Sequence, residues 1–193
     1  MKKLLIMSLL LFSTMNNQKE HSDLVEIELK NRLASISKTD TLYVDFTLND
    51  FLINFLEENM YTKEKNFSEY NTLVPFLSES NIKMIFNEQE VIYLKKEINN
   101  NFTFTEKDII LKRVVRSNYE EEKKAIGNDG MKLINFKQKE RLFMSKPVIL
   151  SNQEYAISAY SYGNHDSFSS GIHIYRKIKG VWKIYAEIKT SFS

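Results

Sequence analysis

Hydrophobic and polar residues alternate with a period of two along the last third of the chain. Four strand-length runs carry this alternation and are separated by turn residues; they span residues 142–150, 155–162, 171–178 and 181–188. Successive side chains of a strand point to opposite faces of a sheet, so each run has one apolar face to bury. The pattern predicts a sequential antiparallel sheet.

The turn between the last two runs is predicted from the face that their apolar residues must share. A two-residue loop, 179–180, would send the apolar residues of the two runs to opposite faces of the sheet. A three-residue loop, 178–180, instead puts Ile174 and Ile184 on one face, with Gly180 in the left-handed position of a G1 bulge. We therefore expect the longer loop.

The single tryptophan, Trp182, lies in the last of these runs. A lone tryptophan in an alternating strand normally packs on a helix, so Trp182 is expected in the core. The predicted register places it beside Arg176, whose guanidinium would stack on the indole.

Helical periodicity dominates the chain before this sheet. Apolar residues recur at helical intervals in 23–36, 47–56 and 87–99, and Thr47 and Asn87 stand where N-caps would be. Short strands are predicted at 41–46 and 109–115, a loop with short elements at 61–86, and an exposed, charged excursion at 116–130. Together these elements predict an α+β fold, with N-terminal helices packed on a C-terminal antiparallel β-meander.

Composition fits one folded domain and excludes some chemistry. The 193 residues are 42% hydrophobic and 27% charged, with a formal net charge of +2 and no cysteine. Disulfides, thiolate metal sites and cysteine nucleophiles are therefore excluded. Basic residues are interleaved with acidic ones instead of forming a stripe, so no nucleic-acid partner is expected.

The N-terminus has the order of a signal peptide. Met1 to Lys3 are positively charged, Leu4 to Phe12 are apolar apart from Ser8, and a polar exit follows. The apolar run is too short for a stable membrane span, and no pair of small residues marks a cleavage site. We expect a signal peptide over 1–18 and one α+β domain over 19–193, with its antiparallel sheet mainly in 109–190. The alternative is a buried or amphipathic first helix of a cytosolic domain.

Catalytic residue types gather only in the loop 163–171 and just beyond it. His165, Asp166 and His173 offer a base, a carboxylate and a further imidazole next to serine hydroxyls. Adjacent residues do not make a catalytic triad, and no spaced metal-ligand or phosphate-binding glycine motif accompanies them. If the strand is regular, His173 lies on the face opposite Ile172 and Ile174. We expect no metal and no cofactor.

Tyrosines are the other candidate for recognition. Tyr160, Tyr162, Tyr175 and Tyr185 fall in the predicted meander, where rigid aromatic side chains make good binding surfaces. The alternative is that they are ordinary, partly buried sheet tyrosines.

Four short stretches carry a family resemblance: 145–148 (SKPV), 154–157 (EYAI), 174–177 (IYRK) and 180–183 (GVWK). They resemble the C-terminal part of small exported proteins of unknown function from Bacteroidota, many of which carry a cysteine pair in the loop that here is 163–171. The resemblance implies the sheet and export to the periplasm or cell envelope. The expected function is non-enzymatic binding of a protein, peptide or glycan. A hydrolase with a site at the 163–173 loop and an immunity-type inhibitor are the alternatives.

Overall fold

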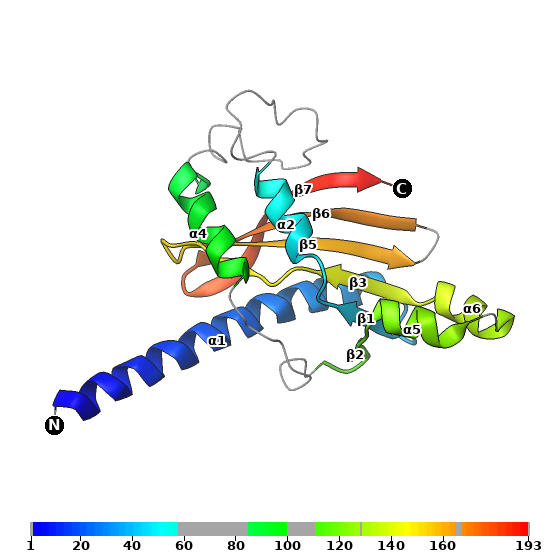
Figure 1. Cartoon of the computed structure of the whole chain (residues 1–193), viewed down its shortest axis with the longest axis horizontal. Coiled ribbons are helices and arrows are strands. Elements are labelled where there is room, and N and C mark those ends of the chain that lie inside the picture. Colours follow the sequence, from blue (N-terminus) through cyan, green and yellow to red (C-terminus); the bar gives the residue numbers. More distant parts are fainter. Residues whose placement is uncertain (1, 58–84, 100–110, 128, 165–166, 193) are drawn as a thin grey trace.

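One mixed sheet organises the protein, with helices on both of its faces. The computed structural model describes residues 2–57, 85–99, 111–127, 129–164 and 167–192, with side chains described from Lys19 to Thr190. The helices are α1 (Lys2–Ser35), α2 (Asn49–Phe55), α4 (Glu88–Asn99), α5 (Tyr119–Ile126) and α6 (Gly130–Lys137). Figure 1 shows their arrangement around the sheet. The predicted α+β class is confirmed.

The sheet joins the C-terminal meander to two early strands. Its strands are β1 (Leu42–Asp45), β2 (Val114–Arg116), β3 (Glu140–Met144), β4 (Val148–Ile149), β5 (Tyr155–Asn164), β6 (Ser167–Ile178) and β7 (Val181–Phe192). The order is β2-β1-β3-β5-β6-β7, with β4 also paired to β5. All pairs are antiparallel except β1 with β2 and β1 with β3. The predicted meander is present, and the early strand at 41–46 extends it in parallel.

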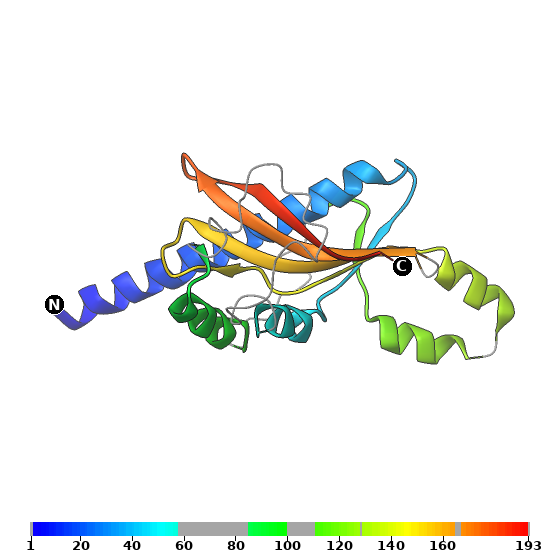
Figure 2. The same ribbon diagram turned by 90° about the horizontal axis from the view of Figure 1, so that it is seen from above.

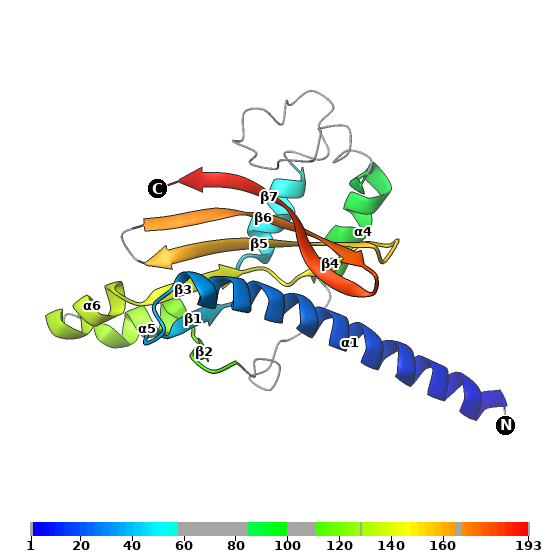
Figure 3. The same cartoon turned by 180° about the vertical axis from the view of Figure 1, so that it is seen from behind.

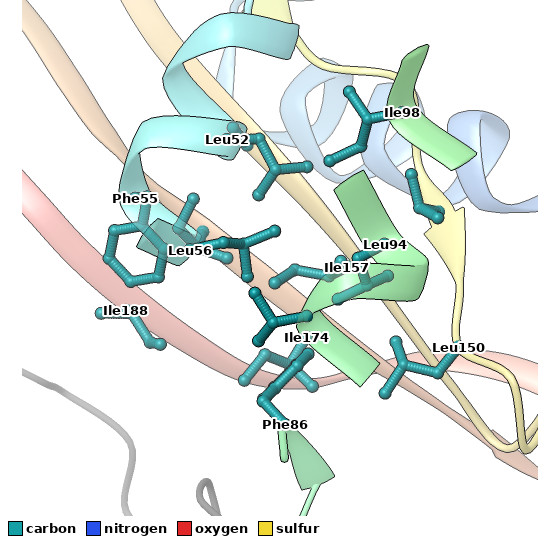
Figure 4. Packing of buried hydrophobic residues seen from close by; sticks show 14 of the residues in the cluster. Leu52, Phe55, Leu56, Phe86, Leu94, Ile98, Leu150, Ile157, Ile174 and Ile188 are labelled. Carbon is teal, nitrogen blue, oxygen red and sulfur yellow. The ribbon is translucent and has the colours of Figure 1, made fainter. Parts of the chain in front are cut away.

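The two faces of the sheet are covered by different helices. Helix α1 crosses one face, while α2 and α4 cover the other, and the view from above separates these layers (Figures 2 and 3). On the α2 and α4 side, Leu52, Phe55 and Leu94 meet Ile157 and other sheet residues in the larger apolar core (Figure 4). These residues are almost fully buried, so this face supplies much of the hydrophobic stabilisation.

Helix α1 buries one stripe against the opposite face. Leu24, Val25, Glu28 and Leu29 are all buried, at the spacing that places side chains on one side of a helix. Three of the four are apolar, and Glu28 is the charged exception. The helix is longer than the predicted 23–36, and among the described residues no helix is long and apolar enough to cross a membrane.

The turn between β6 and β7 differs from the prediction. Ile178 pairs with Val181, and Lys179 and Gly180 both have positive φ angles, of 51° and 79°. This is the two-residue loop that right-handed strand twist favours. The predicted three-residue loop is wrong.

A bulge in β7 resolves the conflict that had argued against the short loop. Ile174 pairs with Ala186 while Tyr175 pairs with Ile184, so Tyr185 is an extra residue in β7. Ile184 therefore lies on the α1 face and Ile174 on the α2 and α4 face. The prediction that the two isoleucines share a face is wrong, although each is packed in a core.

Trp182 is buried in the core, as expected, but its cationic neighbour differs. It packs with Leu24 of α1, and the Nζ atom of Lys177 lies 5.2 Å from the indole ring. Arg176 instead lies over the rings of Tyr155 and Tyr185, because the short loop sets Trp182 opposite Lys177. The predicted stacking of Arg176 on Trp182 is wrong.

Only one of the two predicted N-caps is present in the structure. The predicted cap at Asn87 is confirmed, since its Oδ1 accepts the backbone N–H of Glu90. Helix α2 has Leu48 as its N-cap residue and no side-chain cap, so the predicted Thr47 cap is wrong. The predicted strand 109–115 is β2, shifted toward Arg116, with Ile109 and Ile110 outside the described residues; most of the 61–86 loop lies outside them too.

The charged excursion after β2 forms a helical hairpin. Asn118 caps α5 and Asp129 caps α6, each accepting a backbone N–H with its side chain. The two helices extend away from the end of the sheet (Figures 1 and 2). We call Tyr119–Ile126 and Gly130–Lys137 together the α5–α6 hairpin.

Candidate functional site

A cluster of charged and hydroxyl side chains lies between α1 and the sheet. It contains Glu28, Arg32, Ser158, Tyr160, His173, Tyr175 and Glu187, which we call the His173 cluster. Most of its members are fully buried, including Glu28, Tyr175 and His173, which is 3% exposed. Buried polar groups are costly unless they are paired, so their partners decide what this cluster does.

Local geometry explains how these residues meet. Alternate residues of β5 and β6 point toward α1, which brings Tyr160 and His173 to the same face. The bulge at Tyr185 changes the alternation in β7 and turns Glu187 to that face as well. Arg32 follows Glu28 by one helical turn, so both point at the sheet.

The Glu28 carboxylate is the centre of the cluster. Its Oε2 atom lies 2.6 Å from His173 Nδ1 and accepts a hydrogen bond of 3.1 Å from the Tyr175 hydroxyl. Its Oε1 atom accepts a hydrogen bond of 2.8 Å from Arg32 Nε. Ser158 contacts the Tyr175 hydroxyl at 3.0 Å. Both carboxylate oxygens are thus occupied by groups of the protein itself.

A second carboxylate closes the cluster on the other side of His173. Glu187 accepts a hydrogen bond from the Tyr160 hydroxyl, and its Oε1 lies 3.8 Å from His173 Nε2. The guanidinium of Arg32 lies 4.2 Å from the centre of the Tyr160 ring. The imidazole is therefore held between two carboxylates.

Tyr160 fits here because its cross-strand neighbour is a glycine. Tyr160 pairs with Gly171, and a Cβ atom at Gly171 would lie 2.8 Å from the Tyr160 hydroxyl and 2.5 Å from the carbonyl oxygen of Ile188. Only a residue without a side chain leaves room for this ring.

The cluster shifts the pKa of each of its titratable groups. Burial by itself lowers the pKa of His173, but the facing carboxylates of Glu28 and Glu187 outweigh it and raise the pKa above the usual 6.5. Burial raises the pKa of Glu28, but the cations of His173 and Arg32 outweigh it and bring the pKa to about 2. His173 lowers the pKa of Glu187 to about 2 against its partial burial. With His173 protonated, two cations balance two carboxylates.

The α5–α6 hairpin offers the opposite kind of surface. Met131, Leu133 and Ile134 are 70%, 39% and 52% exposed, although large apolar side chains usually lie inside. A groove of about 290 Å³ runs between the two helices, with Ile126 and Phe136 in its lining and Lys132 and Lys139 at its sides.

The base of the hairpin is fixed to the sheet by buried charge. Arg141 is almost fully buried, donates to Glu122 Oε2 at 2.9 Å and lies 4.4 Å from the Phe136 ring. Lys139 donates to the same oxygen at 2.8 Å. These contacts hold α5 and α6 beside β3 and lower the pKa of Glu122 against its partial burial.

No protein-family model, curated protein or solved structure matches this chain.

The structure describes one of the three predicted catalytic residues, His173. His165 and Asp166 lie outside the described residues, and His173 points into the interior, opposite Ile172 and Ile174 as predicted. Its partners come from α1 and β7, not from the 163–171 loop. Over the described ranges, no group of three or more His, Asp or Glu residues is placed to hold a metal ion.

The predicted tyrosine surface is divided among different environments. Tyr160 and Tyr175 are buried and hydrogen bonded, so they present no surface to a partner. Tyr162 is partly exposed near Ser35 and Arg32, while Tyr185 packs on Tyr155 from the bulge in β7. The four tyrosines do not form one platform.

Proposed function

We propose that the protein is exported to the bacterial cell envelope and acts there as a non-enzymatic binding protein. The charge order of the N-terminus supports export. The burial of His173 between α1 and the sheet supports a structural role for the cluster, because its two ring nitrogens face Glu28 and Glu187 of the protein itself.

The α5–α6 hairpin carries the binding part of this proposal. Three of the exposed large apolar side chains lie within four consecutive residues of α6, at Met131, Leu133 and Ile134. Exposed apolar groups that cluster on a protein surface are typical of sites that contact another molecule. Among the described residues, the remaining exposed large apolar side chains are Ile92 on α4, Val115 on β2, and the paired Ile178 and Val181 at the β6–β7 turn.

Fractionation of the native cell followed by co-purification tests the proposal. The expected result is recovery of the protein in the envelope fraction, with an N-terminus created within or just after residues 1–18 and with a bound component. Recovery in the cytosol with Met1 intact would exclude export. Turnover of a substrate that depends on His173 would exclude the non-enzymatic assignment.

A further inference from the structure

The end of the β6–β7 ribbon, residues 176–183, combines exposed apolar side chains with basic ones. Ile178 and Val181 flank the two-residue turn as a cross-strand pair and are 43% and 58% exposed. The turn is open, because a Cβ atom at Gly180 would have nothing within 4 Å. Figure 2 shows this end of the ribbon projecting from the sheet, away from α2 and α4. Its side chains can therefore contact a surface outside the protein.

The strand register places the apolar pair and two cations on one face of the ribbon. Ile178 pairs with Val181, and the next pair on the same face is Arg176 with Lys183, because side chains alternate between the two faces. The Arg176 side chain agrees with this face, since its guanidinium lies over two tyrosine rings that pack on the apolar core of α2 and α4. One surface thus carries two exposed aliphatic side chains and two cations.

These side chains are ordered by their distance from the turn. The apolar pair flanks the turn, and the cationic pair follows two residues behind it, about 7 Å further along the ribbon. The guanidinium carbon of Arg176 lies 5.5 Å from the centre of the Tyr155 ring and 5.4 Å from that of Tyr185. At a bilayer surface, apolar groups lie deepest, while cationic and tyrosine side chains lie at the level of the headgroups. The ribbon has the same order.

The charge of this end of the ribbon is positive. Residues 174–186 contain four cations and no carboxylate. Glu20 of α1 pairs with Lys177, and the backbone of the exposed Glu154 contacts the same residue. Even with both carboxylates counted, the ribbon keeps an excess of two positive charges. Within the part of the chain that the structure describes, Lys179 and Lys183 are exposed and have no ion pair.

We infer that the end of the β6–β7 ribbon is a peripheral contact for an anionic lipid bilayer. Ile178 and Val181 enter the boundary between headgroups and acyl chains. Arg176, Lys179 and Lys183 contact the anionic headgroups. This surface is separate from the α5–α6 hairpin, so the inference goes beyond the proposed function and needs from it only a membrane within reach.

Shape and charge favour a bilayer over a protein partner. A stable protein interface buries on the order of 800 Å² on each partner, whereas the open turn offers two aliphatic side chains. A second copy of the chain would bring the unpaired Lys179 and Lys183 of two ribbons together. A bilayer accepts a small projecting end, because each cation near its negative surface adds about fivefold to the affinity.

Trp182 reports on this contact, because it is the single tryptophan of the chain and follows Val181 in the ribbon. The purified protein is titrated with vesicles of phosphatidylcholine alone and with vesicles that contain equal parts of phosphatidylglycerol. Both kinds also contain a lipid with a spin label near the top of its acyl chain. We expect quenching of Trp182 fluorescence by the anionic vesicles only, weakened by high salt. Local quenching separates this contact from one made by the apolar run at 4–12.

Two double variants remove the two parts of the surface separately. I178S/V181S should lower the affinity for anionic vesicles by about tenfold or more, because it removes the exposed apolar pair. K179Q/K183Q should lower it by about 25-fold, because each lysine near an anionic surface contributes about fivefold. Circular dichroism melting of each variant checks that the fold is retained.

Each variant has a matched control on other elements. I92S/V115S removes apolar side chains that are 50% and 47% exposed on α4 and β2. K123Q/K124Q removes two exposed lysines of α5. Both controls should bind anionic vesicles within about twofold of the original protein, because charges more than a Debye length from the contact are screened.

Three results would overturn the inference: equal binding to neutral vesicles, no quenching of Trp182, or an equal loss in a control variant. Loss in M131S/I134S but not in I178S/V181S would assign vesicle binding to the α5–α6 hairpin instead. If vesicles do not bind but poly-L-glutamate does, and K179Q/K183Q abolishes that binding, the partner of the ribbon is an acidic protein. None of these results bears on export or on a component that co-purifies from the envelope, so the proposed function stands or fails separately.

Discussion

A single glycine decides whether Tyr160 can reach Glu187. Because a Cβ at Gly171 would meet both Tyr160 and the backbone of Ile188, Gly171→Ala should displace the ring and destabilise the protein by about 1–3 kcal/mol. Gly130→Ala is the matched control, since nothing lies within 4 Å of a Cβ there and the residue opens α6. Urea denaturation of both variants measures the difference. Equal stability of the two would mean that the contact between Tyr160 and Gly171 is not tight.

The His173 cluster predicts how stability depends on pH. His173 has a folded pKa above 6.5, so its contribution is complete below about pH 6.5 and is lost as pH rises through the folded pKa. Glu28 and Glu187 have folded pKa values of about 2, so their contribution is present above about pH 4.5 and is lost as pH falls toward 2. We expect the free energy of unfolding, measured by urea titration, to be greatest between about pH 4.5 and 6.5.

His173→Gln provides the control for this pH dependence. The amide can still donate a hydrogen bond to Glu28 but does not titrate, so the decline above pH 6.5 should disappear. The acid limb should shrink as well, because Glu28 and Glu187 lose the cation that lowers their pKa values. An unchanged alkaline limb would assign that decline to other groups.

At the level of elements, the order and type of the C-terminal strands could be predicted, but not their exact register. Period-two alternation identified β5, β6 and β7 and placed His173 opposite Ile172 and Ile174. The turn prediction failed because it assumed that every apolar residue of β7 faces one core. The protein has a core on each side of the sheet, and the bulge at Tyr185 moves β7 from one to the other. Apolar residues on both faces of β7 are favourable here because helices cover both faces of the sheet.

The residues that form the His173 cluster could not be predicted from the sequence. Glu28 and His173 are 145 residues apart, and no local pattern links them. Glu28 is the one charged residue within the buried stripe of α1. It could be recognised as a candidate only if the buried face of the helix were already known. On the hairpin, the apolar residues Met131, Leu133, Ile134 and Phe136 suggest a buried helix, yet only Phe136 is buried.

The bulge in β7 leads to a prediction about a whole strand. Deleting Tyr185 removes the extra residue and leaves a regular strand, in which Ile184 still pairs with Tyr175, Ala186 with Ile174 and Glu187 with His173. We expect the deletion variant to keep cooperative unfolding, because each side chain stays on its present face of the sheet. Tyr185→Ala keeps the bulge and should cost at most about 3 kcal/mol. Thermal melts followed by near-UV circular dichroism compare both variants with the original protein, and loss of cooperative melting in the deletion variant would contradict this register.

At the level of the whole molecule, α1 acts as one layer of the fold. It supplies Leu24, Val25 and Leu29 to the apolar cores and Glu28 to the His173 cluster, so the face of the sheet opposite α2 and α4 depends on it. Among the described side chains, its first contacts with the sheet region come from Glu20, which pairs with Lys177, and His21, which contacts the carbonyl of Pro147. The N-terminal part of α1 extends beyond the sheet (Figure 3).

This division of α1 predicts the effect of shortening the chain. A protein that begins at Lys19 keeps both first contacts and the whole buried stripe, so its free energy of unfolding should stay within about 0.5 kcal/mol of that of the full chain. A protein that begins at Lys30 lacks Glu28 and leaves His173 facing no carboxylate from α1, besides losing Leu24, Val25 and Leu29. It should not unfold cooperatively, because a buried charge and an apolar face are both uncovered. Urea denaturation of the three proteins measures this. If the protein that begins at Lys19 fails to fold, residues 1–18 belong to the folded domain and removal of a signal peptide there is excluded.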